Sequence, residues 1–218
     1  MRITVLTGAG ISAESGIPTF RDEDGLWCKH RVEDVATRDA LNNNPDFVNK
    51  FFNDRRRSLA DVEPCGAHKI LAELEKNHHV TIITQNIDDL HERGGSSRVI
   101  HVHGELKKSR CNETGEVLEQ SGDIAPEDNR RPHVCLFGET PYFLHETYAA
   151  LHDCDLYVSI GTSGLVWPVS GYIDKINSVV RVPTVEINPK ETEISHKFQR
   201  VIRKTATDGL KELLDELS

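Results

Sequence analysis

The chain has 218 residues, of which 37% are hydrophobic and 28% are charged, and its formal net charge is −9. This composition is typical of a globular protein with a real core, and it excludes a disordered, collagen-like or coiled-coil chain. The acidic balance gives no general attraction for nucleic-acid phosphates, so we expect no nucleic-acid partner.

The sequence also bears on whether the protein spans a membrane and on the compartment in which it works. The apolar stretches are far shorter than the ~20 residues that cross a bilayer, and the first residues read as a strand rather than a signal peptide. The five cysteines are odd in number and scattered, which is typical of reduced thiols. We therefore expect a cytoplasmic protein with no membrane partner.

Short β-rich runs alternate with helical patterns, which is typical of an α/β protein with a parallel sheet. Helices are expected from Asn44-Pro45 onward, over Ala67–Lys76, and at the end of the chain, where leucines recur at helical spacing from Leu210 to Leu217. The expected strands are Ile3–Leu6, Val80–Thr84, Val99–Val102, Leu156–Ile160, Thr184–Ile187 and Phe198–Ile202.

Two stretches interrupt this alternation within a single expected domain of residues 1–218. The segment from Glu105 to Pro132 is polar and lacks a convincing helix, so we expect a small β-rich lobe inserted at about 105–133. A second irregular segment lies at about 15–60 and is least regular from Ser15 to Thr37. Loops of this length in compact domains are often functional.

The first expected strand ends in the glycine-rich turn Gly8-Ala9-Gly10-Ile11-Ser12-Ala13. Glycines after a strand let backbone N–H groups approach a phosphate, and a following helix N-terminus favours its charge. Ala13 replaces the third glycine of the dinucleotide fingerprint, and the region 21–25 is loop-like where a dehydrogenase has a strand ending in an acidic residue. An ordinary Rossmann dehydrogenase is therefore disfavoured, while a turn that binds no nucleotide stays open.

Three further expected strands also end in small or polar residues: Thr84-Gln85-Asn86-Ile87-Asp88, Gly161-Thr162-Ser163 and Glu186-Ile187-Asn188. Taken singly, each of these segments is explained as an ordinary turn that binds no ligand. Together with the glycine-rich turn they favour a nucleotide at the carboxyl edge of the sheet, where open α/β sheets bind ligands.

The segment His101-Val102-His103-Gly104 closes the third expected strand, and alternation puts both histidines on one face. Two histidines could bind a metal, but no convincing third ligand is present. A base at the sheet edge is more plausible, because an unperturbed histidine titrates near neutral pH. A structural histidine remains the alternative, and it is the preferred interpretation for His68 inside a predicted helix.

Six motifs follow one another along the chain: Gly8-Ala9-Gly10-Ile11-Ser12, Gly16-Ile17-Pro18-Thr19-Phe20-Arg21, Thr84-Gln85-Asn86-Ile87-Asp88, His103-Gly104, Phe137-Gly138-Glu139 and Gly161-Thr162-Ser163. This ordered set resembles the sirtuins, which are NAD-dependent protein deacylases. The similarity spans nearly the whole chain. It is closest to the bacterial CobB-type, class III group, because of Asp24-Gly25-Leu26-Trp27 and the segment His30–Thr37.

The resemblance implies a Rossmann-like parallel sheet with helices on both faces and a small inserted lobe. NAD, consumed as co-substrate, and an acyl-lysine protein or peptide would bind between them. It implies NAD contacts at Gly8, Ala9, Gly10, Ser12, Phe20, Arg21, Trp27, Gln85, Asn86, Ile87, Asp88, Gly161, Thr162, Ser163, Asn188 and Ala206. The implied substrate strand includes Val134, Leu136, Phe137 and Gly138, which would pair with the substrate backbone.

The resemblance also implies a mechanism in which the acyl oxygen attacks C1′ of the nicotinamide ribose and nicotinamide leaves. Asn86 and Asp88 would hold the nicotinamide amide, and His103 would accept a proton from the ribose hydroxyls. The products would be free lysine, nicotinamide and O-acyl-ADP-ribose. Two alternatives stay open: another NAD-cleaving enzyme (an ADP-ribosyltransferase or NAD glycohydrolase), and an NAD-binding module without activity, against which the presence of His103 counts.

The chain departs from the sirtuin pattern at the usual zinc site. Family members typically carry two cysteine pairs in the small lobe, whereas this chain has Cys111 alone between Glu105 and Pro132, with Cys135 just outside. One thiolate cannot build a tetrahedral site. We therefore expect no zinc, with a lobe held by packing and hydrogen bonds.

A second departure concerns the acyl group. Class III members resemble one another in a Tyr and an Arg three residues apart, which share a helix face and bind an acyl carboxylate. The matching residues here are Phe52 and Arg55, with a register uncertain by one residue against Phe51. We expect deacetylation with weaker desuccinylation; the alternative is that Phe52 is simply a core residue.

Overall fold

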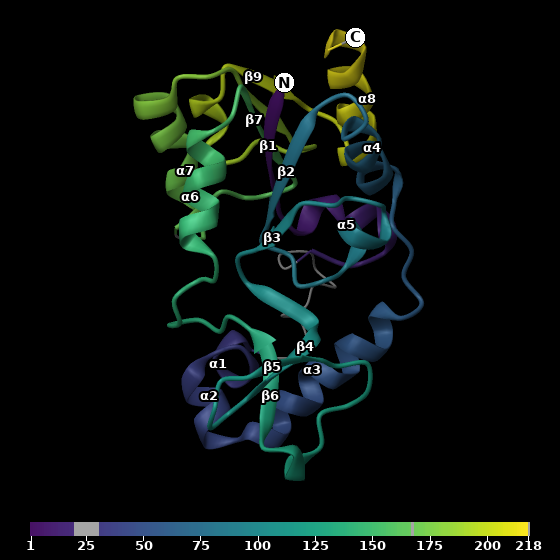
Figure 1. Cartoon of the computed structure of the whole chain (residues 1–218), viewed down its shortest axis with the longest axis vertical. Coiled ribbons are helices and arrows are strands. Elements are labelled where there is room, and N and C mark those ends of the chain that lie inside the picture. Colours follow the sequence, from purple (N-terminus) through teal and green to yellow (C-terminus); the bar gives the residue numbers. More distant parts are fainter. Residues whose placement is uncertain (20–30, 167, 218) are drawn as a thin grey trace.

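The computed structural model describes residues 1–19, 31–166 and 168–217. Its elements form two lobes stacked along the long axis, a larger one around a parallel sheet and a smaller one below it (Figure 1). No helix within the described residues is both long and apolar enough to span a membrane.

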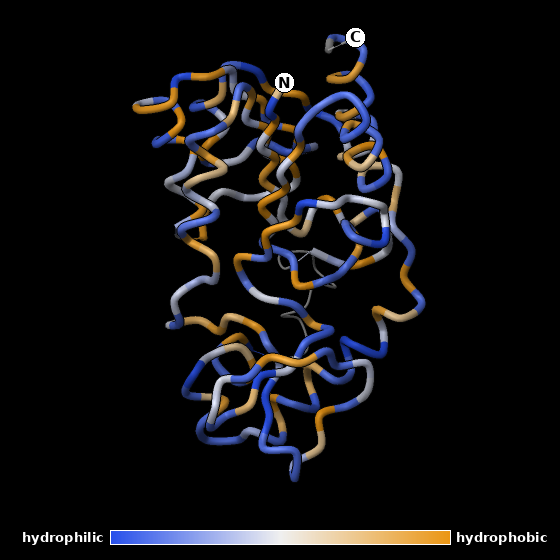
Figure 2. The backbone as a smooth tube through the Cα atoms, in the orientation of Figure 1, coloured by the Kyte–Doolittle hydropathy of each residue, from blue (hydrophilic) through white to orange (hydrophobic). Residues whose placement is uncertain are grey.

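The larger lobe is built on a six-stranded sheet in the order β3-β2-β1-β7-β8-β9, and every pairing is parallel. The strands are β1 (Arg2–Thr7), β2 (His79–Thr84), β3 (Val99–His101), β7 (Leu156–Ile160), β8 (Thr184–Ile187) and β9 (Arg200–Ile202). All six expected strands are confirmed, with small shifts at their ends. Figure 2 shows hydrophobic residues along the central strands, as a sheet covered on both faces requires.

Helices cover both faces of this sheet. On one face α4 (Gly66–Leu74) and α8 (Ala206–Leu217) pack on a cluster that includes Val5, and on the other α6 (Leu144–His152) and α7 (Tyr172–Lys175) pack on one that includes Leu6. Val5 and Leu6 are adjacent, so they point to opposite faces. Shorter elements are α5 (Leu90–Arg93), the 3₁₀ turns Ala9–Ile11, Ala13–Ser15, Pro126–Asp128, Val169–Gly171 and Ser195–Lys197, and a π-helical turn Ile176–Val180.

The smaller lobe joins two segments that are far apart in the sequence. It contains the antiparallel strands β4 (Gly104–Cys111), β5 (Val117–Glu119) and β6 (Arg130–Val134) with the helices α1 (Val32–Val35), α2 (Arg38–Asn43) and α3 (Pro45–Leu59). Asn44 caps α3 by accepting a hydrogen bond from the Phe47 N–H at 3.3 Å, as Asn44-Pro45 predicted. Val48 of α3 shares one apolar cluster with Leu106 of β4 and Val134 of β6.

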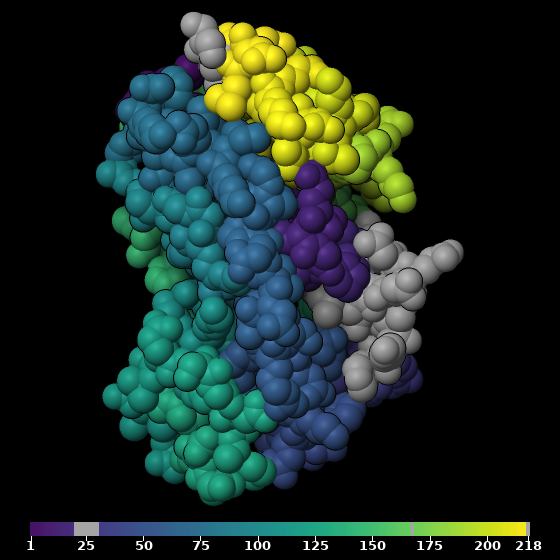
Figure 3. Space-filling model, turned by 90° about the vertical axis from the view of Figure 1, so that its right-hand side faces the viewer, coloured from purple at the N-terminus to yellow at the C-terminus, as the bar shows by residue number. Residues whose placement is uncertain are grey.

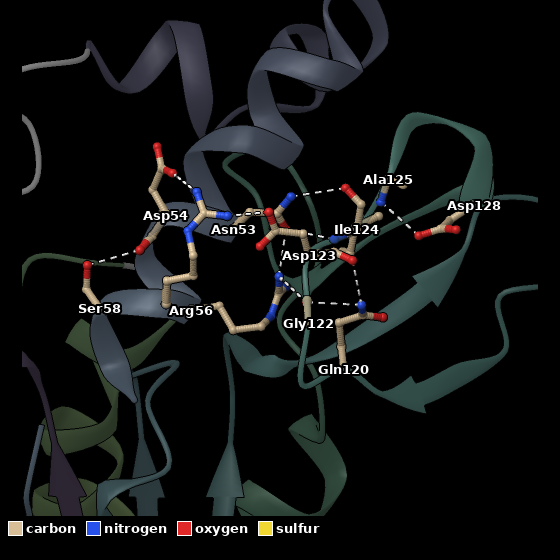
Figure 4. A network of polar contacts seen from close by, with 11 residues as sticks. Asn53, Asp54, Arg56, Ser58, Gln120, Gly122, Asp123, Ile124, Ala125 and Asp128 are labelled. Atoms are coloured by element: carbon tan, nitrogen blue, oxygen red, sulfur yellow. Dashed lines mark hydrogen bonds and ion pairs between the residues drawn. The ribbon is translucent and has the colours of Figure 1, made fainter. Parts of the chain in front are cut away.

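Side chains of α3 hold the irregular loop that follows β5 (Figure 4). The Asn53 amide donates to the Ile124 carbonyl and accepts from the Ile124 N–H, both at 3.0 Å. Buried Arg56 donates to the Leu106 carbonyl at 2.8 Å, to Asn53 Oδ1 at 2.7 Å and to the Gly122 carbonyl at 3.3 Å. These bonds satisfy backbone groups of the loop that have no strand to pair with, as backbone pairing does in a sheet.

We predict that Asn53→Ala lowers the free energy of unfolding by about 2–3 kcal/mol, because it leaves the buried N–H and carbonyl of Ile124 without partners. Urea unfolding followed by circular dichroism measures this loss. Ser58→Ala on the exposed side of the same helix is the control, with an expected change within about 0.5 kcal/mol. Equal losses in the two variants would contradict the role of Asn53.

Candidate active site

The order in which the chain adds strands reverses at β1, which pairs with β2 on one side and with β7 on the other. The chain runs outward from β1 through β2 and β3, and again outward through β7, β8 and β9. The loops after β1 and β7 therefore diverge at a topological switch point, where open α/β sheets bind ligands. The strand ends that the sequence singled out meet at this point.

Glycines let the loops after β1 and β7 touch. The Gly8 N–H donates to the Ile160 carbonyl at 3.0 Å, and the Gly10 N–H donates to the Gly161 carbonyl at 2.9 Å. A Cβ on Gly10 would lie 2.6 Å from the Gly161 Cα, and Gly161 itself has φ +62°. A side chain at either position would push the loops apart, which is a second reason for glycine besides access of a ligand to the backbone.

Polar side chains link four loops at this edge of the sheet. Gln85 Nε2 donates to Thr162 Oγ1 at 2.8 Å, and Asn188 Nδ2 donates to the Thr162 carbonyl at 3.1 Å. Asn86 Nδ2 donates to the Gly8 carbonyl at 3.2 Å. The ends of β1, β2, β7 and β8 therefore form one surface, with Ala9 and Ser163 in the same loops.

Asp88 is a buried carboxylate beside the glycine-rich turn. Its oxygens accept from Ser12 Oγ at 3.1 Å and from the Leu90 N–H at 3.2 Å, and Ser12 Oγ in turn accepts from Asn86 Nδ2 at 3.1 Å. Burial raises the pKa of Asp88, although both hydrogen bonds oppose that shift. Asn86, Asp88 and Ser12 thus form a compact polar group behind the loop.

The loop after β2 is held through three successive carbonyls. His103 Nδ1 lies 3.1 Å from the Gln85 oxygen, and His101 Nδ1 lies 3.2 Å from the Asn86 oxygen. The Leu106 N–H donates to the Ile87 oxygen at 2.7 Å. A carbonyl only accepts, so both Nδ1 atoms carry the hydrogen in these contacts.

This contact fixes the chemistry of His103. Burial lowers its pKa, while the hydrogen bond to the Gln85 carbonyl acts in the opposite direction. A neutral ring with hydrogen on Nδ1 keeps a lone pair on Nε2, which is the atom that can accept a proton. His103 is therefore suited to act as a general base near neutral pH.

The segment 134–139 lies against this histidine. The Cys135 N–H donates to the His103 carbonyl and the Phe137 N–H donates to the Ala36 carbonyl, both at 2.8 Å. Val134 and Leu136 are buried, whereas Phe137 is 53% exposed and Gly138 has φ +89°. The four residues of the expected substrate strand thus form one short segment with a buried and an exposed part.

A two-pronged ion pair clamps this segment. Arg131 Nη1 and Nη2 lie 2.6 and 2.8 Å from the two oxygens of Glu139, which also accepts from the Leu136 N–H at 2.9 Å. Burial alone would raise the pKa of Glu139, but these donors hold it below its ordinary value. Glu139 stands in a motif that the sequence singled out, whereas nothing in the sequence pointed to its partner Arg131.

The helix α3 presents Phe52 and Arg55 differently. Phe52 is buried in the apolar cluster of the small lobe. Arg55 is half-buried, its guanidinium lies 3.2 Å from the centre of the Phe51 ring, and its Nη1 donates to the Phe51 carbonyl at 3.0 Å. Burial lowers the pKa of Arg55 to about 10, so it stays a cation at neutral pH.

Other expected residues lie elsewhere. Phe20, Arg21 and Trp27 fall outside the described residues. Ala206 is buried at the start of α8 in the same apolar cluster as Ile11. Glu14, after the glycine-rich turn, accepts from the Thr207 N–H at 3.1 Å, and Figure 3 shows this N-terminal surface beneath α8.

Among the described residues, the histidines and cysteines outside this edge of the sheet have other partners or none that suit a metal. No group of three or more His, Cys, Asp and Glu side chains there is arranged to hold a metal ion, and the absence of zinc stays a prediction. His101 uses both ring nitrogens on Asn86 and Glu92. His68 is fully buried in α4 with Nδ1 3.2 Å from Cys65 Sγ, as a structural histidine would be.

Comparison with known proteins gives consistent results. A model described as the Sir2 family matches residues 8–168. An NAD-dependent protein deacylase of Vibrio vulnificus (strain YJ016) is 47% identical over 228 residues, which is 99% of this chain and 93% of that protein. One of Escherichia coli (strain K12) is 44% identical over 229 residues, covering 99% of this chain and 82% of that protein.

Solved structures give the same picture. A Sir2 homologue in complex with NAD superposes with a TM-score of 0.90 at 34% identity, over 99% of this chain and 88% of that one. A Sir2 protein with a deacetylated p53 peptide and 3′-O-acetyl ADP ribose superposes with a TM-score of 0.83 at 26% identity, over 98% and 92%.

We predict that Glu139→Gln speeds hydrogen exchange of the Leu136 amide about tenfold or more, because the amide loses a charged acceptor and the turn loses its ion pair. Amide exchange measured by NMR on the folded protein tests this. Glu146→Gln on the exposed side of α6 is the control, and equal protection of Leu136 in both variants would show that the clamp does not order the segment.

Proposed function

The chain belongs to the Sir2 family and is an NAD-dependent protein deacylase, and we propose that it removes acyl groups from lysine side chains at the carboxyl edge of its sheet. One observation carries the placement. The loops after β1, β2, β7 and β8, where NAD is proposed to bind, are called the dinucleotide edge. The His103 ring binds the Gln85 carbonyl of this edge, and the His103 carbonyl accepts from the Cys135 N–H of the segment 134–139. A base at that junction can serve two substrates at once.

The proposed NAD contacts are the strand-end residues that the structure brings together. At this edge the glycine-rich turn, whose glycines leave the backbone uncovered by side chains, lies beside amide side chains from neighbouring loops, a polar surface that suits phosphates and ribose hydroxyls. The described members of the set are Gly8, Ala9, Gly10, Ser12, Gln85, Asn86, Ile87, Asp88, Gly161, Thr162, Ser163 and Asn188, with Ala206 at its margin.

Three side chains carry the proposed chemistry. When NAD is bound, its C1′ is the carbon that the acyl oxygen attacks as nicotinamide leaves. Asn86 and Asp88, already held by Gly8 and Ser12, orient the carboxamide of the leaving group. His103 Nε2 takes the ribose hydroxyl proton, so that the 2′-oxygen can attack the acyl carbon. With one water consumed, the proposed products are free lysine, nicotinamide and O-acyl-ADP-ribose.

The acyl-lysine peptide is proposed to bind along 134–138 by adding a strand, a mode in which main-chain hydrogen bonds supply affinity. Exposed Phe137 and the clamped turn after it support this placement. An ADP-ribosyltransferase or NAD glycohydrolase would need the dinucleotide edge but not this segment. We further propose cytoplasmic action on protein substrates, since Cys65, Cys111, Cys135 and Cys154 are free thiols.

The balance between acyl groups is proposed to depend on Arg55. A half-buried cation can bind a succinyl carboxylate by a charge-assisted, two-pronged contact. Phe52 has no hydroxyl to add a hydrogen bond, and Ala36, in the same apolar cluster, is small enough to leave room for a longer chain. We therefore propose deacetylation with weaker desuccinylation.

We predict that His103→Ala lowers deacylation of an acetyl-lysine peptide about 10²–10⁴-fold, the usual effect of removing a general base. Mass spectrometry of peptide and NAD-derived products measures the rate, and circular dichroism checks the fold. His145→Ala, at an exposed position of α6, serves as control. Near wild-type turnover of the His103→Ala protein would refute the assignment.

We predict that Phe52→Tyr raises kcat/KM for succinyl-lysine peptides about tenfold, the effect of one hydrogen bond to a charged group, and leaves acetyl-lysine nearly unchanged. Phe51→Tyr is the matched control for the register. Arg55→Met should remove the succinyl activity selectively. If these substitutions shift both acyl substrates equally, Arg55 and its aromatic neighbour do not bind the acyl carboxylate.

A further inference from the structure

The mechanism leaves one buried titratable group at the active edge unexplained. His101 ends β3, its side chain is 4% exposed, and it lies two residues before the proposed base. Its Nδ1 is 3.2 Å from the Asn86 carbonyl oxygen, and its Nε2 is 2.8 Å from Glu92 Oε1 on α5. The ring therefore bridges the loop after β2 and the helix that follows it.

Both partners of His101 are hydrogen-bond acceptors. A neutral imidazole has one N–H and satisfies one of them, whereas the imidazolium donates to both. His103 differs because one ring nitrogen faces a carbonyl and the other is left for the reaction. Two histidines two residues apart thus have opposite roles: the His101 ring faces two acceptors, whereas the His103 ring keeps one nitrogen to accept a proton.

The charged groups around His101 favour the cation. Glu92 faces it from α5, Glu105 from β4 and Asp88 from the loop after β2, while His91 of α5 is held uncharged by burial. Burial alone would lower the pKa of His101, but the bond to Glu92, the nearby carboxylates and the Asn86 carbonyl raise it above the ordinary value.

We propose that His101 and Glu92 form a charged positioning pair that fixes the peptide unit after Asn86 and so aims Asn86 and Asp88 at the nicotinamide end of NAD. The pair acts through Asn86, whose N–H already donates to Thr84 Oγ1 at 3.1 Å and whose amide donates to Gly8 and Ser12. His101 donates to the Asn86 carbonyl, the backbone acceptor of the same residue. This inference rests on the proposed placement of NAD at the loop 85–88.

The pair makes NAD turnover depend on pH in a specific direction. A histidine whose folded pKa is raised keeps its contribution below that pKa and loses it as pH rises through it. His103 works in the opposite sense, because a base is competent only above its own pKa. The profile of kcat/KM for NAD is therefore bell-shaped, with His101 on the alkaline limb and His103 on the acid limb.

Glu92→Gln tests the pair without disturbing the core, since the Glu92 side chain is 43% exposed. The amide oxygen can still accept a hydrogen bond, but the charge that stabilises the imidazolium is gone. We expect the alkaline limb of the profile to move to lower pH. At a pH between the shifted limb and the wild-type limb, KM for NAD should rise about tenfold, while KM for the acyl peptide stays unchanged. Glu63→Gln is the matched control, because Glu63 pairs with Arg93 of the same helix and is 83% exposed.

A second measurement needs no turnover. Nitrogen-15 NMR of the protein without NAD reports the protonation of each ring, and we expect both nitrogens of His101 to carry hydrogen at neutral pH, with the titration shifted downward in Glu92→Gln. A His101 ring with one hydrogen, or an alkaline limb that responds alike to Glu92→Gln and Glu63→Gln, overturns the proposal. If the proposed function fails instead, NAD-dependent deacylation is absent from the wild-type protein while the His101 titration is unaffected.

Discussion

The carbonyls of Gln85, Asn86 and Ile87 each accept a hydrogen bond from a donor between residues 101 and 106. A buried carbonyl without a donor is destabilising, so this loop can keep its shape only while the segment after β3 lies against it. That segment is also where the chain leaves the parallel sheet and begins β4 of the small lobe. The proposed base, the loop of the dinucleotide edge and the connection between the lobes therefore share one set of hydrogen bonds.

Two histidines in this set have opposite electrostatic surroundings. His103 is partly buried with its ring against the Gln85 carbonyl, which favours the neutral ring, whereas buried His101 lies between a carbonyl and the Glu92 carboxylate, which favours the cation. Desolvation acts on both, so the difference comes from the second ring nitrogen and what it meets. One is left with a free lone pair for proton transfer, and the other holds the backbone in place.

The sequence allowed much of the sheet and its active edge to be predicted, because both depend on local pattern. The run Leu156–Ile160 is buried on both faces, and such strands read as continuous apolar stretches whose ends gather at one edge. The small lobe was predicted only in part, since Val48 and Leu106 meet through tertiary packing that no local pattern encodes. Glu92 and Arg131 were missed for the same reason: a surface carboxylate and a strand arginine look ordinary until the fold supplies His101 and Glu139.

The small lobe reaches the active edge through a continuous series of contacts. The loop after β5 is held by Asn53 and Arg56, and Arg56 donates to the Leu106 carbonyl. The Leu106 N–H donates in turn to the Ile87 carbonyl in the loop after β2. One residue of β4, Leu106, thus receives a bond from the lobe's buried arginine and gives one to the dinucleotide edge. Because a helix side chain fixes the backbone at Leu106, the positions of Asn86 and Asp88 depend on how the lobe is packed as well as on the sheet that precedes them.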